Sequence, residues 1–269
     1  MQGILSAHSS ENRNILCDDR YELIMEAYIM RIDGRCADQL RPVKLTTGFS
    51  SFAEGSCLIE TGNTMVLCNA SVEDRPPKHV PEGEGWITAE YSMLPRANRE
   101  RSRRDISKLK LSPRSAEIQR LIGRSLRAAA DLKKLGPFSI TIDCDVLQGD
   151  GGTRTASVTG GFVALVLACR KLMEQGALRQ WPVTGCVAAV SAGIVDDALL
   201  LDLCYEEDSH AQVDLNCVMN DAGCLIELQA TGEGRAFTTA EQRQLVDLCA
   251  GGIRRLQEIQ LEALGGKLL

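Results

Sequence analysis

The sequence has few aromatic residues and no long apolar run. Phe, Trp and Tyr make up 4% of the 269 residues, which leaves little material for base-stacking surfaces. No run approaches the roughly 18 uninterrupted apolar residues of a membrane-spanning helix. The chain does not begin with a basic stretch followed by an apolar core, so no secretory signal is expected. We therefore expect a cytoplasmic protein with no membrane partner.

Several catalytic and cofactor-binding motifs are also missing. No G-x-G-x-x-G follows a strand pattern, which argues against a dinucleotide-binding fold, and no G-x-S-x-G elbow indicates a hydrolase. The glycine-rich stretch Glu82–Trp86 lacks the G-K-[ST] ending of a P-loop, and its glutamates would repel phosphate. The three histidines, His8, His79 and His210, lie far apart and give little support to Ser-His-Asp catalysis.

Cysteine is abundant, but its pattern does not indicate disulfides or a metal site. The 11 cysteines contain no C-x-x-C pair. Several lie within apolar runs, namely Cys68, Cys169, Cys217 and Cys249. We expect buried reduced thiols that act as small hydrophobic side chains, and no structural zinc site.

The net charge of −6 hides a strong segregation of charge. Residues 96–127 contain 11 Lys or Arg and 3 Asp or Glu, a local charge of +8, which leaves −14 for the rest. A concentrated basic segment on an acidic body can bind a polyanion locally. A helix with a solvated basic face is the alternative, and it explains Arg120, Arg124 and Arg127 better than the arginines between residues 96 and 104.

Hydrophobic patterning indicates one domain with interleaved strands and helices. We expect residues 1–29 to be an N-terminal extension, disordered or read from a mis-set start codon, and residues 30–269 to form the domain. Strand patterns occupy 56–60, 64–72, 86–94, 139–146, 183–202, 213–219 and 224–231. Because some strands follow one another as hairpins, the fold class is α+β, a mixed β-sheet packed with α-helices.

Three segments have helical patterns. The first begins at Pro113, with Ser112 as its N-cap, and is expected to continue to Gly136. The second covers residues 156–173. The third covers 239–264, with Thr239 and Gln242 placed as a capping box.

The most informative stretch is Asp150–Thr155, which lies between a predicted strand and the second predicted helix. Its two glycines leave backbone N–H groups uncovered, and Thr153 and Arg154 follow at once. Amides at a helix start, the positive end of the helix and a guanidinium together favour an anion. We predict a phosphate cradle here that Arg114 joins through folding. A tight turn with a surface arginine is the alternative on this stretch alone.

A second candidate site is the acidic segment that ends at Asp214. The alternation places Ala211, Val213, Leu215 and Cys217 on one face, and Gln212, Asp214 and Asn216 on the other. Asp208 is expected in the turn just before this strand. Two such carboxylates could hold Mg²⁺, or one could protonate a leaving oxygen. Local sequence alone favours a solvated acidic turn beside an edge strand.

Long ordered motifs across residues 30–264 resemble the ribonuclease PH family. They are Met30–Arg35, Gly83–Arg96, Glu117–Arg127 and Ile142–Leu147 leading into Asp150–Thr155. The resemblance implies a fold like ribosomal protein S5 domain 2, assembled as a homo-hexamer, a trimer of dimers. It implies a phosphorolytic exoribonuclease that trims the 3′ ends of tRNA precursors and other structured RNA. Inorganic phosphate is the co-substrate, and nucleoside diphosphates are released.

The resemblance also assigns roles to individual residues. Phosphate would be bound by Arg114, Gly152, Thr153 and Arg154. Divalent metal binding, with Mg²⁺ expected, or protonation of the leaving oxygen would fall to Asp208 and Asp214. RNA entry and ring assembly would be supported by Arg96, Arg101 and Arg104.

The chain departs from the usual family pattern at Leu109, Pro113 and Cys204. These changes bear on loop flexibility and activity, although the phosphate-site and acidic-pair residues are all retained. Two alternatives stay open. One is a catalytically inactive RNA-binding ring subunit of an exosome-like assembly, and the other is a small-molecule kinase of the same fold, which the missing nucleotide loop disfavours.

Overall fold

The computed structural model describes residues 31–104 and 111–269. The chain divides into two compact units, residues 1–37 and 38–269, and every element below belongs to the second unit. The expected extension 1–29 and Leu109 lie outside the described residues. The domain boundary at residue 30 therefore stays a prediction.

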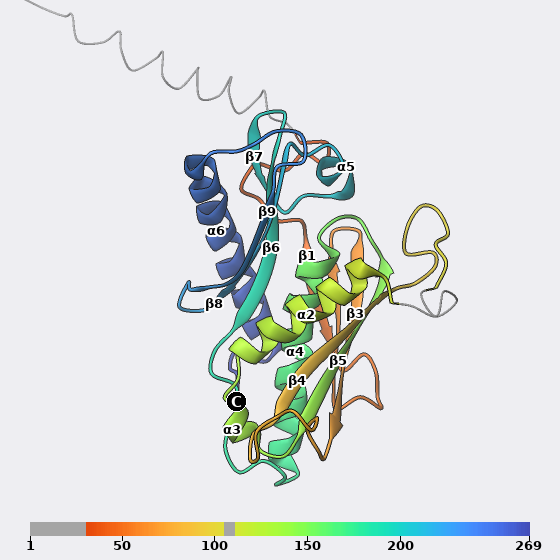
Figure 1. Ribbon diagram of the computed structural model, residues 1–269, viewed down its shortest axis with the longest axis vertical. Coiled ribbons are helices and arrows are strands. Elements are labelled where there is room, and N and C mark those ends of the chain that lie inside the picture. Colours follow the sequence, from red (N-terminus) through yellow and green to blue (C-terminus); the bar gives the residue numbers. More distant parts are fainter. Residues whose placement is uncertain (1–30, 105–110) are drawn as a thin grey trace, which may run out of the picture. The chain divides into compact units, whose positions relative to one another are not determined.

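The first half of the second unit contains a five-stranded mixed sheet, with the order β1-β2-β3-β5-β4 (Figure 1). Its strands are β1 (Val43–Thr47), β2 (Gly55–Thr61), β3 (Thr64–Glu73), β4 (Trp86–Met93) and β5 (Ser139–Gln148). Strands β2 and β3 form the predicted antiparallel hairpin, whereas β4 runs parallel to β5. The parallel pair makes the sheet mixed, as predicted.

Helix α2 (Pro113–Ala128) covers this sheet and begins as the sequence predicts. The Ser112 hydroxyl accepts a hydrogen bond from the Ser115 amide at 3.0 Å, and Pro113 occupies the first turn. The expected end at Gly136 is wrong, because α2 stops at Ala128 and a short helix α3 (Leu132–Leu135) follows. The Asp131 carboxylate accepts hydrogen bonds from the first amides of α3 and so starts a separate helix.

The second half contains a four-stranded antiparallel sheet, with the order β7-β6-β8-β9. Its elements are β6 (Val187–Val195), β7 (Ala198–Leu201), α5 (Tyr205–Asp208), β8 (Val213–Asn220), β9 (Leu225–Thr231) and α6 (Thr239–Ala263). Asp208, expected in a turn, ends α5. The capping box of α6 lies one residue earlier than predicted, at Thr238 and Glu241. The Glu241 carboxylate reaches back to the Thr238 amide at 2.6 Å.

Helix α4 (Thr153–Glu174) is the central element of the core. It is long and apolar enough to span a membrane by length and composition, and it is mostly buried. Its contacts with β2 and β3 on one side and with β6 on another account for that apolar composition. Strand β6 is buried on both faces because α6 packs against its other side.

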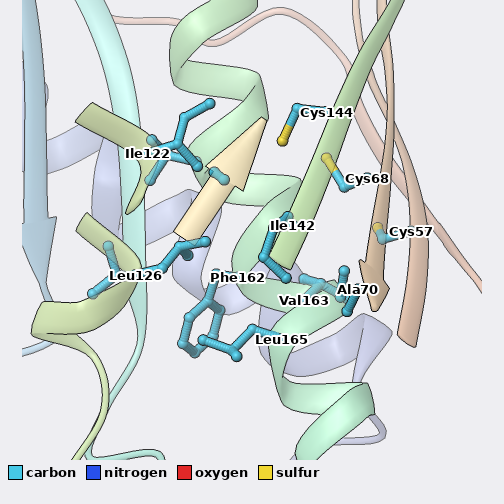
Figure 2. Packing of buried hydrophobic residues seen from close by; sticks show 14 of the residues in the cluster. Cys57, Cys68, Ala70, Ile122, Leu126, Ile142, Cys144, Phe162, Val163 and Leu165 are labelled. Atoms are coloured by element: carbon cyan, nitrogen blue, oxygen red, sulfur yellow. The ribbon is translucent and has the colours of Figure 1, made fainter. Parts of the chain in front are cut away.

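Figure 2 shows how the strands and helices of the core meet. Phe162 and Leu165 from α4 and Leu126 from α2 pack near Ile142 of β5. Neighbouring positions on β2, β3 and β5 are occupied by Cys57, Cys68 and Cys144.

Cys68, Cys169, Cys217 and Cys249 form no disulfide and are buried, as predicted. Burial raises the pKa of Cys57 and of Cys169 to about 12. These thiols therefore stay protonated and contribute to packing as small apolar groups.

Candidate active site

The loop between β5 and α4 brings backbone amides to the start of the central helix. Gly151 and Gly152 have φ values of 76° and 65°, a conformation that favours glycine. A Cβ atom at Gly151 would lie 2.5 Å from the Leu203 carbonyl oxygen, so the loop also needs glycine for close packing. Gly152 is the N-cap and supplies no side-chain cap. The first N–H groups of α4 therefore have no capping side chain, as a binding site for an anion requires.

The side chains of the predicted cradle are held by both halves of the unit. Arg154 donates from Nη1 to Gln229 Oε1 on β9 at 2.8 Å. The Thr153 hydroxyl lies 2.8 Å from the hydroxyl of buried Tyr91 on β4. Arg114 is exposed in the first turn of α2. Folding thus places two arginines from two helices around one hollow.

That hollow has a volume of about 310 Å³, within the range of small-ligand sites. Its lining contains all six residues predicted for phosphate and the acidic pair. The lining residues are Arg114, Gly152, Thr153, Arg154, Ser191, Asp208, Ser209, Ala211, Asp214, Asn216 and Glu233. Residues far apart in the sequence therefore meet at one place.

The acidic wall of the hollow is formed by α5 and β8. Asp214 is half-buried, and both of its carboxylate oxygens accept from Asn216 Nδ2, at 3.3 and 3.1 Å. Desolvation and the neighbouring charge of Asp208 raise the pKa of Asp214 to about 6, against the opposing effect of Arg154. Desolvation also raises the pKa of Asp208, although Arg114 and Arg154 act in the opposite direction. The local expectation of a merely solvated acidic turn does not describe Asp214.

The two carboxylates fit a hard divalent cation. Desolvation, and after it the charge of Asp208, raises the pKa of Asp214, and a cation bound by both carboxylates would offset their repulsion. Carboxylate oxygens with water completing the shell are the ligands that Mg²⁺ prefers. In the described part of the chain, no group of three or more His, Cys, Asp or Glu side chains is placed to hold a metal ion.

The three arginines predicted for RNA entry and assembly lie outside the hollow. Arg96, Arg101 and Arg104 are exposed on the segment that follows β4. The segment is attached to the cradle, because Gly149 donates its amide to the Ala97 carbonyl at 2.8 Å. Arg99 of the same segment lies over the Tyr205 ring at 5.9 Å. The stretch of residues 96–104 therefore borders the site without lining it.

Sequence reasoning missed several residues around the hollow. Asn216 shares a strand face with Asp214, so the period-two pattern could have identified it. Glu233 follows β9 and has no local signal. Tyr91 and Thr64, which contact the cradle, could not be found because their partners lie far away in the sequence.

These elements define a protein class. The mixed sheet covered by helices, followed by an antiparallel sheet with its own helix, is the α+β fold of the ribosomal protein S5 domain 2-like class. Within that class, the chain belongs to the 3′ exoribonuclease family, the ribonuclease PH family. The profile of family domain 1 matches residues 39–171, and that of domain 2 matches residues 185–248. The resemblance drawn from the sequence motifs is confirmed.

Solved structures share this fold over most of the chain. Rrp46 from rice (Oryza sativa) has a TM-score of 0.72 at 17% identity and covers 87% of this chain and 100% of its own. An archaeal exosome core chain has a TM-score of 0.70 at 24% identity, with 90% and 95% covered. A chain of the Archaeoglobus fulgidus exosome with RNA bound to the active site has a TM-score of 0.70 at 24% identity, with 89% and 96% covered.

Proposed function

We propose that the protein is a phosphate-dependent 3′-to-5′ exoribonuclease that trims the 3′ ends of tRNA precursors. One observation carries the proposal. An anion cradle of free amides and two arginines faces a carboxylate pair across one hollow. Family membership supports a phosphorolytic reaction, because it implies inorganic phosphate as co-substrate.

The two walls would divide the chemistry of phosphorolysis. Arg114, Thr153, Arg154 and the first amides of α4 hold inorganic phosphate as the nucleophile. A phosphate oxygen bonds to the phosphorus of the last phosphodiester, and the bond from that phosphorus to the 3′ oxygen breaks. The shortened RNA gains a proton on its 3′ oxygen, and a nucleoside diphosphate leaves. A carboxyl group with a pKa near 6, as in Asp214, is suited to supply that proton.

The alternative to proton donation by Asp214 is a divalent cation, which would bind Asp208 and ionised Asp214 and would offset negative charge on the scissile phosphodiester. Arg96, Arg101 and Arg104 would contact the RNA backbone, since exposed arginines bind phosphates without reading bases. We also propose a homo-hexameric ring, which would bring several such basic segments together. Light scattering coupled to gel filtration tests it, and a monomer would contradict the ring.

The alternative is an inactive RNA-binding ring subunit. Two of the similar structures come from archaeal exosomes, which favours a ring assembly of this kind. The enzyme is the better proposal because Arg114, Thr153, Arg154, Asp208 and Asp214 are all present and all line the hollow. An inactive subunit would have no need of that complete set.

The test uses 3′-extended tRNA, Mg²⁺ and ³²P-labelled phosphate. Label in nucleoside diphosphates, with RNA shortening that depends on phosphate, supports the proposal. Shortening without phosphate would mean a hydrolase, and RNA binding without shortening would mean the inactive subunit. The matched control is the same incubation with the Asp214→Asn variant, whose RNA length and labelled product give the baseline.

A further inference from the structure

The carbonyl groups of the phosphate loop are bonded to residues outside the hollow. Arg41 Nη1 donates to the Asp150 carbonyl oxygen. Thr64 Oγ1 donates to the Gly151 carbonyl oxygen at 2.7 Å and accepts from the Asp150 amide at 2.9 Å. Neither Arg41 nor Thr64 lines the hollow. Both residues therefore contact the loop on the side that faces away from the hollow.

Peptide geometry gives these bonds a consequence at the anion site. In a planar trans peptide, the C=O and the following N–H point in opposite directions. Holding the Gly151 carbonyl toward Thr64 therefore directs the Gly152 N–H the other way. Gly152 lines the hollow, so its N–H is available on the side where an anion would bind. A carbonyl turned into the hollow would instead repel phosphate.

Arg41 is itself fixed by a buried carboxylate. It donates to Asp202 from Nη2 at 2.7 Å, from Nε at 3.0 Å and from its backbone amide at 2.8 Å. Each side chain is only 4% exposed. A bidentate ion pair of this kind fixes the plane of the guanidinium group. Because buried ion pairs contribute little net stability, a positioning role explains the pair better than a stabilising one.

We propose that Arg41 and Thr64 are positioning residues for inorganic phosphate. They hold the carbonyls of Asp150 and Gly151 and so aim the amides at the start of α4 into the hollow. Neither residue touches phosphate itself. The inference rests on the proposed function for the identity of the anion.

The test compares two substitutions at Thr64, which is fully buried. Thr64→Val keeps the side-chain shape and removes the hydroxyl, whereas Thr64→Ser keeps the hydroxyl. Calorimetric titration of RNA-free protein with inorganic phosphate gives the dissociation constant, and kinetics give separate KM values for phosphate and RNA. For Thr64→Val we expect both phosphate constants to rise about 5- to 20-fold, because two hydrogen bonds are lost. Its KM for RNA stays within about twofold.

The serine variant should bind phosphate within about twofold of wild type. Arg41→Lys is the second variant. It keeps a positive charge beside Asp202 but cannot reproduce the guanidinium fork, so the phosphate constants should rise about tenfold. A purely structural role would lower Tm while leaving the phosphate dissociation constant of the folded protein unchanged, and that result would overturn the inference. Equal rises in both KM values would overturn it too.

Failure of the proposed function gives a different pattern. Wild-type protein that binds phosphate yet forms no nucleoside diphosphate contradicts the exoribonuclease, while phosphate titration of the variants still decides the roles of Arg41 and Thr64. Wild-type protein that binds no phosphate contradicts both proposals.

Discussion

The two halves of the second unit contribute opposite chemistry to the hollow. The half built on the five-stranded sheet supplies cations and free amides, through Arg114 at the start of α2 and Arg154 at the start of α4. The half built on the four-stranded sheet supplies carboxylates, through Asp208 on α5 and Asp214 on β8. Neither half could bind an anion and handle a proton or cation alone. The difference shows that the site exists only where the halves meet.

The acidic half is tested most severely by Asp214→Asn. This change removes the carboxylate and keeps the side-chain size, and we expect turnover to fall at least about 100-fold because proton transfer or cation binding is lost. Initial rates of nucleoside diphosphate release measure it. Asp196→Asn, in the turn between β6 and β7, makes the same chemical change outside the hollow. Equal losses in both variants would contradict the assignment.

The basic half is tested by Arg154→Ala. Loss of a charge-assisted hydrogen bond should raise the KM for phosphate about 10- to 100-fold. RNA binding, measured by fluorescence anisotropy with a labelled oligonucleotide, should weaken less than about threefold. Arg243→Ala, at an exposed position of α6, serves as the control for loss of a surface cation. Equal fold-changes in the KM for phosphate and in RNA affinity would contradict the distinction between the two halves.

The pH dependence of stability sharpens the comparison. The pKa of Asp214 is about 6 in the folded protein, against an ordinary value of 3.8. Below about pH 4, the neutral carboxyl group of Asp214 adds its full contribution to the free energy of unfolding. That contribution is lost as the pH rises through about 6 and the group ionises in the folded protein. In metal-free buffer, Asp214→Asn should be more stable than wild type near pH 7.5 by about 1 to 2 kcal/mol, with solvent screening considered.

The gain in stability of Asp214→Asn over wild type should vanish near pH 4, where Asp214 in the folded wild-type protein is neutral. Added Mg²⁺ should shrink the gain at pH 7.5, because a bound cation offsets the repulsion between Asp208 and Asp214. Thermal unfolding of both proteins at the two pH values provides the measurement. A gain that does not change with pH would show that Asp214 is ionised without cost.

The smallest effect is expected at a contact between the halves away from the hollow. Arg124 on α2 pairs with Glu227 on β9 at 3.0 Å, and the arginine is half exposed. Arg124→Ala should lower the free energy of unfolding by less than about 1 kcal/mol, as exposed ion pairs do. Urea unfolding measures this change. A raised KM for phosphate in this variant would mean that the interface, and not only the hollow, sets phosphate affinity.

Much of the fold follows from short-range patterns. The stripe of Ile118, Leu121, Ile122 and Leu126 on α2 is buried as its spacing predicts. Ser112 and Pro113 fix the start of the same helix. Its end was not predictable from periodicity, since the Asp131 cap that starts α3 competes with continuation toward Gly136. The capping box of α6 was misplaced by one residue because two Thr residues stand side by side and either can act as the N-cap.

The candidate site was partly predictable as well. Two glycines followed by Thr153 and Arg154, after a predicted strand, indicated an anion cradle, with a tight turn as the alternative. The roles given to the six residues of the hollow remain predictions, although the structure brings all six together. The contribution of Arg41 was not predictable, since its partners are 109 and 161 residues away.

The sequence by itself determined many local features of this protein: where most of the strands and the three long helices lie, where glycine opens the loop at residue 151, and which family the motifs resemble. These depend on backbone conformation and periodicity within a few neighbouring residues. Only the tertiary structure decided that Asp214 has a raised pKa and that Arg41 and Thr64 hold the loop from behind. Desolvation and hydrogen bonds between distant strands exist only once the chain has folded.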